Sequence, residues 1–275
     1  MVVNGERARI LVTVKAAPQP SAKYGDTVCV AGIRVDTGEH DWVRLYPVPF
    51  RWLDANSQFG KYDIVELFMR RRTQDSRKES YVPDTQSIRV SQHLDGWEER
   101  TPFINDVALT TTCRLMSEAE TDHAAPSLGM VSVAELIDFT LEEHPGWSAE
   151  EQAKIDRSMA AGEMDVFGTS TQPTKLRAPR VKLRYRYRCH EERCPGHFGQ
   201  NLDWELRAFQ NRFHSDSIGR LKERVEQRFV DMMFSPKRST SFFMGNFEAA
   251  IKRSKFSVLG VYWPPAGVAS KVTLF

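Results

Sequence analysis

Residues 175–197 read KLRAPRVKLRYRYRCHEERCPGH, and this stretch carries the strongest structural signal in the chain. Between Val181 and Arg188, apolar and cationic residues alternate strictly, which is typical of a strand with one buried and one solvated face. The tyrosines of this strand would then lie in the core, and a row of cationic side chains would face solvent. The row comprises Lys182, Arg184, Arg186 and Arg188.

The same stretch ends in a cluster of residues that can bind a metal ion. Cys189, Cys194 and His197 fall within nine positions, His190 adds a nitrogen, and the Cys-Pro-Gly-His turn can aim two ligands at one ion. Four such ligands would form a tetrahedral zinc site. We predict Cys189, Cys194, His197 and His190 as ligands. His214, Cys29 and Cys113 are the other candidates for the fourth position.

A zinc ion at this place is expected to be structural, because a metal knuckle between a strand and a helix pins an otherwise loose loop. The spacing of the ligands matches no standard zinc finger. Two buried free thiols and two surface imidazoles are therefore the alternative interpretation of the cluster.

The charges are distributed unevenly along the chain. Its net charge is only +2, yet residues 175–275 contain 20 Lys/Arg and 9 Asp/Glu, a net charge of +11. Residues 95–174 contain 4 and 16, a net charge of −12. A concentrated basic segment is the usual footprint of an anionic polymer partner. The alternative is that the acidic middle packs on the basic end and neutralises it within the protein.

Four segments near the N-terminus are short, rich in Val, Ile and aromatic residues, and separated by Gly, Pro and Asp, which predicts strands. They span residues 9–15, 27–34, 41–46 and 62–70. Strands at this spacing favour a small antiparallel barrel or curled sheet that closes on itself, because closure hides the sheet edges. Further along, Ser148 and Glu151 form a capping-box motif that predicts the start of a helix.

These elements predict an α+β protein, with an N-terminal antiparallel β-barrel-like unit followed by a mixed α/β unit that holds the zinc knuckle. The predicted divisions are a barrel-like domain over residues 1–94, an acidic segment of mixed helix and strand over 95–162, a linker over 163–180 and a basic α/β domain over 181–275. Gly, Pro, Ser and Thr in the third segment favour a linker. An ordered excursion within one domain is the alternative.

Composition limits the class and the location of the protein. An apolar fraction of 41% and a charged fraction of 27% are typical of a globular chain. No apolar run approaches the roughly 20 residues of a membrane helix, and the charged N-terminus does not read as a signal peptide. Four cysteines are too few for a disulfide scaffold. We therefore expect a cytoplasmic protein with reduced thiols and no membrane partner.

The cationic row suits the phosphate backbone of a nucleic acid. Its arginines would lie about 6.6 to 7 Å apart on one side of a strand, close to the spacing of successive phosphates on an extended strand. Residues 41–52, DWVRLYPVPFRW, mix aromatic side chains with arginines, as base-stacking surfaces do. The predicted contacts are Lys182, Arg184, Arg186, Arg188, Arg44, Arg51 and Trp42.

We therefore predict a protein that binds RNA or DNA, single-stranded or through its backbone, with a basic C-terminal face supported by the zinc knuckle. A cationic face that is merely solvated is the alternative interpretation of the row. A scaffold protein whose acidic middle docks a protein partner is a further alternative.

A metal-dependent nuclease is the remaining alternative. Asp203, Glu205 and His197 would then hold Mg²⁺ or activate water for attack on a phosphodiester. However, the Glu-x-Lys pattern of sheet nucleases is absent, and Asp203 reads more simply as a helix N-cap. The chain also lacks a Gly-rich phosphate loop and a Gly-x-Ser-x-Gly elbow, which argues against ATP-driven work and against an esterase.

Overall fold

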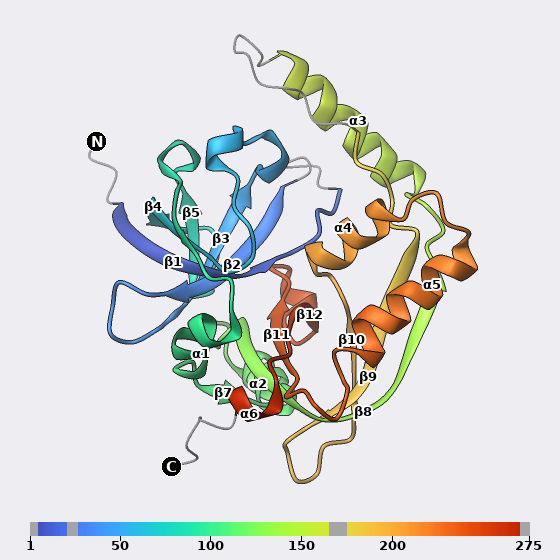
Figure 1. The fold of residues 1–275 in the computed structure, drawn as a ribbon. Helices are drawn as coiled ribbons and strands as arrows, with labels where there is room; N and C mark the ends of the chain where they lie inside the picture. The colour runs from blue at the N-terminus through green and yellow to red at the C-terminus, as the bar shows by residue number, and fades with distance from the viewer. Residues whose placement is uncertain (1–4, 21–26, 165–174, 270–275) are drawn as a thin grey trace.

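A computed structural model describes residues 5–20, 27–164 and 175–269 of the chain. It contains two sheets with helices around them (Figure 1). Both helices and strands are present and the N-terminal sheet closes into a barrel, which confirms the α+β class and the barrel-like first unit. Within the described residues, no helix is both long enough and apolar enough to cross a membrane.

The first sheet consists of six strands. These are β1 (Glu6–Lys15), β2 (Val28–Arg34), β3 (Trp42–Val48), β4 (Asp63–Arg71), β5 (Ser80–Pro83) and β6 (Arg89–His93). The strand order is β1-β2-β3-β5-β4-β6, and β1 also pairs with β4, which closes five strands into a barrel. β3 and β5 are parallel, and the other neighbours are antiparallel. This order and these directions are the topology of the five-stranded Greek-key barrel called the OB-fold.

The curl of the barrel has a local cause. β1 and β2 shift register between Val12 and Val14, which marks a β-bulge. Opposite this bulge stands Gly32, where an added Cβ would lie 2.4 Å from the backbone oxygen of Leu11. A bulge bends its strand, and a glycine lets two backbones approach closely. Together they let the sheet turn tightly enough to close.

The second sheet has the order β10-β9-β8-β11-β12, and a short parallel strand, β7, lies beside β8. Its strands are β7 (Leu109–Thr110), β8 (Leu128–Glu143), β9 (Val181–Cys189), β10 (His197–Gln200), β11 (Ser241–Asn246) and β12 (Phe256–Tyr262). β8 is long because it pairs with two other strands along its length. Its first residues pair with β11, and the rest pair with β9.

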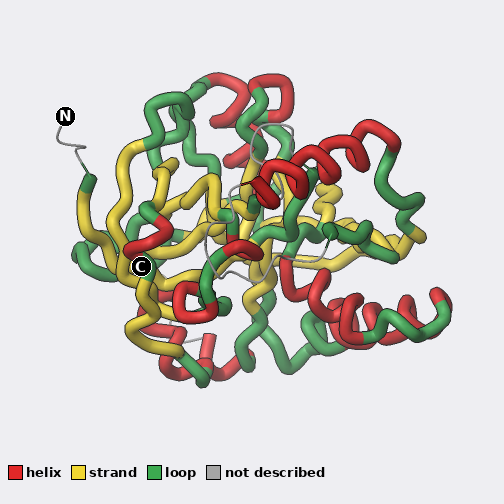
Figure 2. Tube along the Cα trace, turned by 90° about the horizontal axis from the view of Figure 1, so that it is seen from above, coloured by secondary structure: helices red, strands yellow, loops and turns green. Residues whose placement is uncertain are grey.

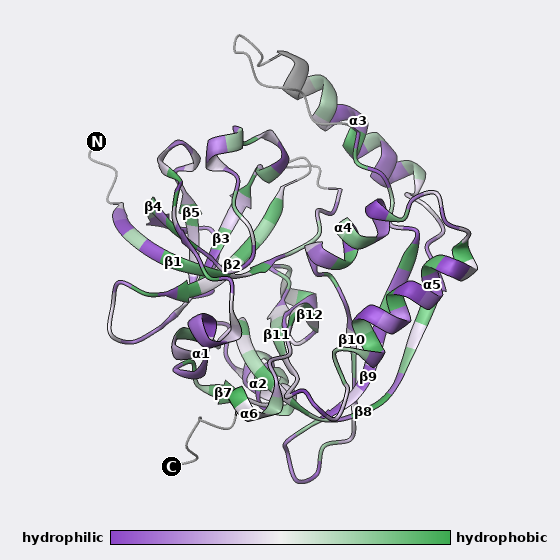
Figure 3. Ribbon diagram, viewed as in Figure 1, coloured by the Kyte–Doolittle hydropathy of each residue, from purple (hydrophilic) through white to green (hydrophobic). Residues whose placement is uncertain are grey.

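The helices lie mostly around the edge of the molecule, while the strands run through its middle (Figure 2). They are α1 (Trp97–Asn105), α2 (Thr112–Thr121), α3 (Ala149–Met164), α4 (Trp204–Arg212), α5 (Ile218–Glu226) and α6 (Ala266–Ala269). A π-helical turn over Gln227–Asp231 continues α5. Short 3-10 turns occupy Phe50–Trp52, Ala55–Ser57, Thr85–Ser87 and Ala250–Lys252. Hydrophilic residues are frequent along α3, α4 and α5 (Figure 3).

The two sheets share apolar contacts. One buried cluster joins barrel residues such as Leu11 and Ile33 to Phe243 and Tyr262 of the second sheet. A buried apolar contact of this kind holds two units in a fixed relation. Grooves and cavities between the barrel and the second sheet are therefore part of one packed body.

Several local predictions are confirmed. The predicted N-terminal strands correspond to β1 to β4, and the strictly alternating segment is β9, with its tyrosines buried and its arginines exposed. The capping box forms, since Ser148 Oγ accepts from Glu151 N and Glu151 Oε2 accepts from Ser148 N. In the predicted linker over 163–180, the first two residues belong to α3, while residues 165–174 lie outside the described residues.

Candidate metal centre and cationic groove

Cys113, Cys189, Cys194 and His197 come together at one end of the second sheet. Their ligand atoms all lie within 4.8 Å of one another. Cys189 ends β9, and His197 begins β10. Cys194 lies in the intervening turn, where Gly196 takes a φ of 90°, a left-handed conformation that favours glycine.

Cys113 arrives from a distant part of the sequence, in the first turn of α2. The side chain of Thr111 caps this helix by accepting from Arg114 N. Next to Cys113, Thr112 Oγ1 lies 2.9 Å from Tyr187 OH, which fixes the start of α2 against β9. The N-terminal end of a helix also favours a thiolate, because its free N–H groups create a positive potential.

Five of the six distances between the four ligand atoms are close to those of a tetrahedral metal site. Cys189 Sγ lies 3.7 Å from Cys113 Sγ and 3.6 Å from Cys194 Sγ. His197 Nε2 lies 3.2 to 3.5 Å from the three sulfurs. An ion with metal–sulfur distances of about 2.3 Å and a metal–nitrogen distance of about 2.0 Å requires edges of about 3.8 and 3.5 Å. The group can therefore hold one four-coordinate metal ion.

The protonation of the group fits the same role. Burial lowers the pKa of His197, so its imidazole is neutral, the form that binds metals. Burial and the neighbouring thiols raise the pKa of Cys113 to about 12. Burial also opposes ionisation of Cys189, but hydrogen bonds from the backbone of Cys113 and from the adjacent thiols lower the pKa of Cys189 overall. Three thiols so close together ionise together only if a cation compensates their charge.

The structure brings three of the four predicted ligands together, and Cys113 takes the fourth position. His190, which was predicted there, is exposed and outside the group. It follows Cys189 directly, and successive residues of a strand point to opposite faces. His214 is exposed beyond α4, and Cys29 lies in β2 beside Arg44.

The cationic row of β9 faces solvent but meets the acidic strand β8. β8 and β9 are antiparallel neighbours over most of their shared length. Arg184 Nη1 lies 3.7 Å from Glu142 Oε2, and Arg188 Nη1 lies 2.7 Å from Glu135 Oε2. The acidic middle of the sequence thus neutralises part of the basic end, which is the alternative that the charge distribution left open.

The other two members of the row form no ion pair with the described residues. The guanidinium of Arg186 lies 5.7 Å from the centre of the Phe198 ring, and Lys182 is the cross-strand neighbour of Glu142. Two of the four cations are thus ion-paired, and the row offers a polyanion less free charge than its sequence suggests.

The three nucleic-acid contacts predicted near the N-terminus do not form one surface. Arg44 is buried, with 3% of its surface exposed. Trp42 is half-buried and packs edge-on against Phe243, with ring centres 5.9 Å apart. Arg51, in the turn after β3, borders a groove. Residues 41–52 thus form part of the core and not one exposed stacking platform.

Asp203 and Glu205 both form ion pairs with one lysine. Lys61 Nζ lies 3.3 Å from Asp203 Oδ2 and 3.4 Å from Glu205 Oε2, and it also donates to the backbone oxygen of Val261. Burial opposes the charge on Lys61, but the two carboxylates raise its pKa. Burial raises the pKa of Asp203 to about 6.

Asp203 also caps α4, since its Oδ1 accepts from Glu205 N. The prediction that Asp203 caps a helix is therefore confirmed. His197, the third residue of the predicted nuclease set, belongs to the metal group and not to this lysine-bound pair.

A groove of about 400 Å³ lies where the barrel meets α4. It is lined by Pro18, Arg51, Lys175, Leu176, Arg177, Trp204, Arg207, Ala208, Asn211 and His214. None of these lining residues is acidic. We call this feature the cationic groove.

Arg207 is the least compensated charge in the cationic groove. It is 8% exposed, and its side chain forms no hydrogen bond or ion pair with any residue in the described ranges. Burial and the nearby charge of Arg51 lower the pKa of Arg207 to about 10. A buried guanidinium near a second one is costly unless an anion approaches. Neither Arg207 nor Arg177 was singled out from sequence, because nothing local distinguishes them from solvated arginines.

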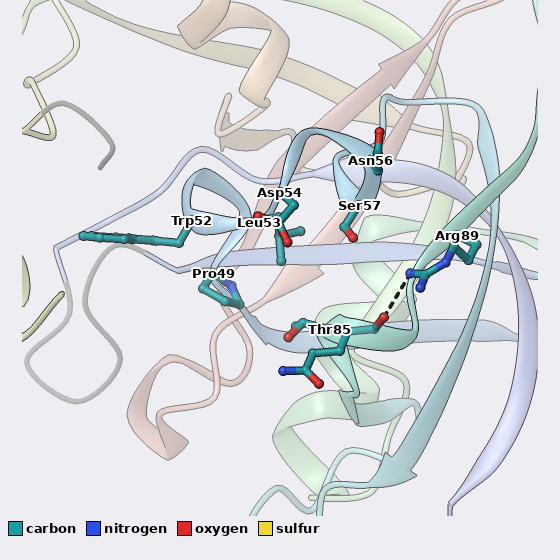
Figure 4. Close-up of a pocket in the computed structure, with 9 residues that line it drawn as sticks. Pro49, Trp52, Leu53, Asp54, Asn56, Ser57, Thr85 and Arg89 are labelled. Atoms are coloured by element: carbon teal, nitrogen blue, oxygen red, sulfur yellow. Dashed lines mark hydrogen bonds between the residues drawn. The ribbon is translucent and has the colours of Figure 1, made fainter. Parts of the chain in front are cut away.

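A further hollow of about 680 Å³ lies at one end of the barrel (Figure 4). Its lining is mostly small and polar, and Arg89 is its only cation. Arg89 Nη1 already donates to the backbone oxygens of Gln86 and Ile88, 2.9 and 2.7 Å away. The ring of Trp52 extends away from the other labelled side chains. The two hydrogen bonds hold Arg89 against its own turn, and the carboxylate of Asp54 lines the same hollow, so the hollow is less cationic than the cationic groove.

Two family models match the chain, and they meet between the barrel with α1 and the second sheet. The model described as Domain of unknown function (DUF8758) matches residues 6–106. The model described as Domain of unknown function (DUF8757) matches residues 108–275. Comparison with curated proteins found no match, and neither did comparison with solved structures.

Proposed function

The chain belongs to the DUF8757 family, and we propose that it is a zinc-containing protein that binds single-stranded nucleic acid in the cationic groove. The observation that carries this proposal is Arg207, a guanidinium 8% exposed and without a hydrogen bond or ion pair to the described residues, in a groove whose lining includes Arg51 and no carboxylate. Arg177 and His214 add a guanidinium and an imidazole to the lining, whereas Lys175 is paired with Asp156 at 2.6 Å. Such an arrangement favours a polyanion over an isolated ion, because the groups are spread along a groove.

The identity of the metal is inferred from the donor set. Three thiolates and one imidazole at tetrahedral spacing favour zinc over metals that prefer oxygen ligands. Four protein ligands leave no open position for water or substrate, so the ion is structural.

The zinc and the cationic groove lie at opposite ends of one strand. Cys189 ends β9, and Arg177 lies four residues before its start. The nine-residue strand itself spans about 26 Å. The metal ties the far end of the β9–β10 pair to α2. It thereby holds rigid the sheet on which the groove-lining segment and α4 rest.

The barrel is consistent with the proposal as fold-level analogy only. OB-folds commonly bind oligonucleotides, but the same fold serves other ligands. The aromatic Trp204 in the groove wall offers a face for a base, since base stacking on aromatic rings is tolerant of sequence.

Matched charge variants test the proposal. Arg51→Gln/Arg207→Gln removes two charges from the cationic groove, and Arg184→Gln/Arg188→Gln removes two from the β9 row. We expect the first variant to weaken binding of labelled oligothymidine by about 10- to 100-fold, as loss of two charged hydrogen-bond donors implies. The second should weaken it far less, because those arginines are already paired.

Fluorescence anisotropy at fixed salt measures both affinities, and metal content confirms that each variant is folded. A larger loss of affinity in Arg184→Gln/Arg188→Gln would mean that the nucleic acid binds the β9 row and not the cationic groove. Disappearance of intact probe on addition of Mg²⁺ would favour the nuclease alternative.

A further inference from the structure

A further cavity shares no lining residue with the cationic groove, although Ala17 and Gln19 of its lining flank Pro18 of the groove in sequence. Its volume is about 250 Å³, and it lies where β2 and β3 face the end of β11. The lining residues are Ala16, Ala17, Gln19, Pro20, Thr27, Cys29, Arg44, Tyr46, Arg77, Leu202, Gly245, Asn246, Phe247, Glu248 and Leu259. We call it the Arg44 cavity.

Arg44 reaches this cavity with its charge uncompensated. Nη1 donates to Cys29 Sγ at 3.1 Å, and Nη2 donates to the backbone oxygen and to Oγ of Ser127 at 2.9 and 3.0 Å. All three acceptors are neutral groups when the thiol is protonated. Nε is buried and has no hydrogen-bond partner. No carboxylate of the described residues lies within ion-pair distance of Arg44.

The neighbouring charges cancel among themselves. Arg77 is bound through Nε and Nη2 to Asp75, and Arg72 bridges Asp75 and Glu248. Burial of Asp75 would raise its pKa, but the hydrogen bonds from Arg77 and Ser80 hold that pKa well below its usual range. Two guanidiniums and two carboxylates therefore form a neutral network beside the cavity. Glu79 brings a further carboxylate nearby, and its Oε1 accepts from Ser127 N at 2.6 Å. Arg44 itself still forms no ion pair with any carboxylate of the described residues.

The rest of the wall is mostly apolar. Leu202, Leu259 and Phe247 line it together with small residues at positions 16, 17 and 20. A buried cation beside apolar surface suits a ligand with one anionic group and an apolar body, because each part then finds its complement. The volume lies below the about 300 Å³ at which pockets for drug-sized ligands begin, so the ligand is small.

We propose that the Arg44 cavity binds a small monocarboxylic acid, whose carboxylate pairs with Arg44 and whose apolar part packs on Leu202, Leu259 and Phe247. A single carboxylate carries one negative charge and neutralises Arg44. A phosphate monoester would carry about 1.5 to 2 charges at neutral pH and leave an excess in a mostly apolar wall. This inference is independent of the proposed binding of nucleic acid.

Benzoate and benzamide test the proposal on the whole protein, because they share a shape and differ in charge. Calorimetric titration should show saturable binding of benzoate, and benzamide should bind at least about tenfold more weakly. In crystals soaked with 4-bromobenzoate, the bromine signal should lie in the Arg44 cavity. Equal affinity for the two probes, or bromine only elsewhere, would overturn the assignment.

Three variants separate the cavity from general charge effects. Arg44→Gln should weaken benzoate binding at least about tenfold, whereas Arg184→Gln, with the same loss of charge on the exposed row, should leave it unchanged. Ala17→Phe adds bulk to the lining while Arg44 itself is kept, and it should also remove binding, which keeps the test decisive if Arg44→Gln does not fold. Unchanged affinity in Ala17→Phe would contradict the proposal, as would tighter binding of inorganic phosphate than of benzoate.

Discussion

Cys113 is the ligand that the sequence pattern does not single out. It lies 76 positions before Cys189, and nothing around it resembles a metal motif. The three other ligands are visible because they fall within one turn and its flanking strands. Which residue becomes the fourth ligand depends on how α2 docks against β9. That docking is a tertiary contact, made in part by Thr112 and Tyr187. Local spacing could therefore predict a metal site but could not choose between Cys113 and His190.

Replacing Cys113 tests the metal assignment at the level of one residue. Cys113→Ser leaves three protein ligands, and we expect the purified protein to lose its zinc and to unfold at a lower temperature. His190→Ala is the matched control and should keep one zinc per chain. Metal analysis by mass spectrometry measures both. Zinc retained in Cys113→Ser but lost from His190→Ala would restore the ligand set predicted from sequence.

Arg207 is predicted to oppose stability while it serves binding. Its lowered pKa means that the charged form is disfavoured in the folded protein, and Arg207 is charged at neutral pH in both states. Removing that charge with Arg207→Met should therefore raise the free energy of unfolding by about 0.5–2 kcal/mol, the range of common single stabilising substitutions. The same variant should bind oligothymidine more weakly.

Chemical denaturation and anisotropy measure these two quantities on the same sample. Arg212→Met, at the exposed end of α4, is the control and should change neither by much. A lower free energy of unfolding in Arg207→Met would show that Arg207 contributes packing to the fold, and would contradict the view that its charge is kept for an anionic ligand.

At the level of elements, β9 shows what the two-residue alternation of a sequence can predict about a strand and what it cannot. The two-residue alternation predicts which side chains are buried, and Tyr185 and Tyr187 are indeed fully buried. It does not reveal which strand lies alongside. The acidic residues of β8 were visible as composition, but their pairing with the arginines depends on an antiparallel register between segments about forty residues apart. Barrel closure between β1 and β4 was likewise beyond any local pattern.

The pairing of β8 with β9 predicts a gain of binding. Glu135→Gln/Glu142→Gln would free Arg184 and Arg188, so we expect tighter binding of oligothymidine at low salt. Stability should change by no more than about 1 kcal/mol for each pair, because exposed ion pairs contribute little. Glu98→Gln/Glu120→Gln changes the net charge equally and is the control. If both double variants bind equally well, net charge alone explains the gain and the β8–β9 pairs do not mask the row.

At the level of the whole molecule, the barrel and the second sheet are joined by a buried charge as well as by apolar contacts. Lys61, just before β4, reaches Asp203 at the start of α4, and the side chains are 6% and 3% exposed. Buried pairs of this kind add little net stability, but removing one partner leaves an uncompensated charge. The pair therefore fixes how the two units meet more than it strengthens the fold.

Lys61→Met should lower the free energy of unfolding by about 3–5 kcal/mol, the usual cost of a broken buried pair. Adding Asp203→Asn should recover much of that loss, since asparagine is neutral and still caps α4. Urea denaturation of the single and double variants measures the recovery. Equal stability of the two variants would mean that Asp203 is not left charged when the lysine is removed.

The salt dependence of nucleic-acid binding tests the proposed function most directly. If Arg51, Arg177 and Arg207 contact phosphates, the logarithm of the oligothymidine binding constant should fall with the logarithm of salt concentration with a slope of roughly −2. In Arg51→Gln/Arg207→Gln the slope should flatten to roughly −0.7, because two contacts are lost. Absence of binding in the wild-type protein, or the same slope in both proteins, would contradict the account.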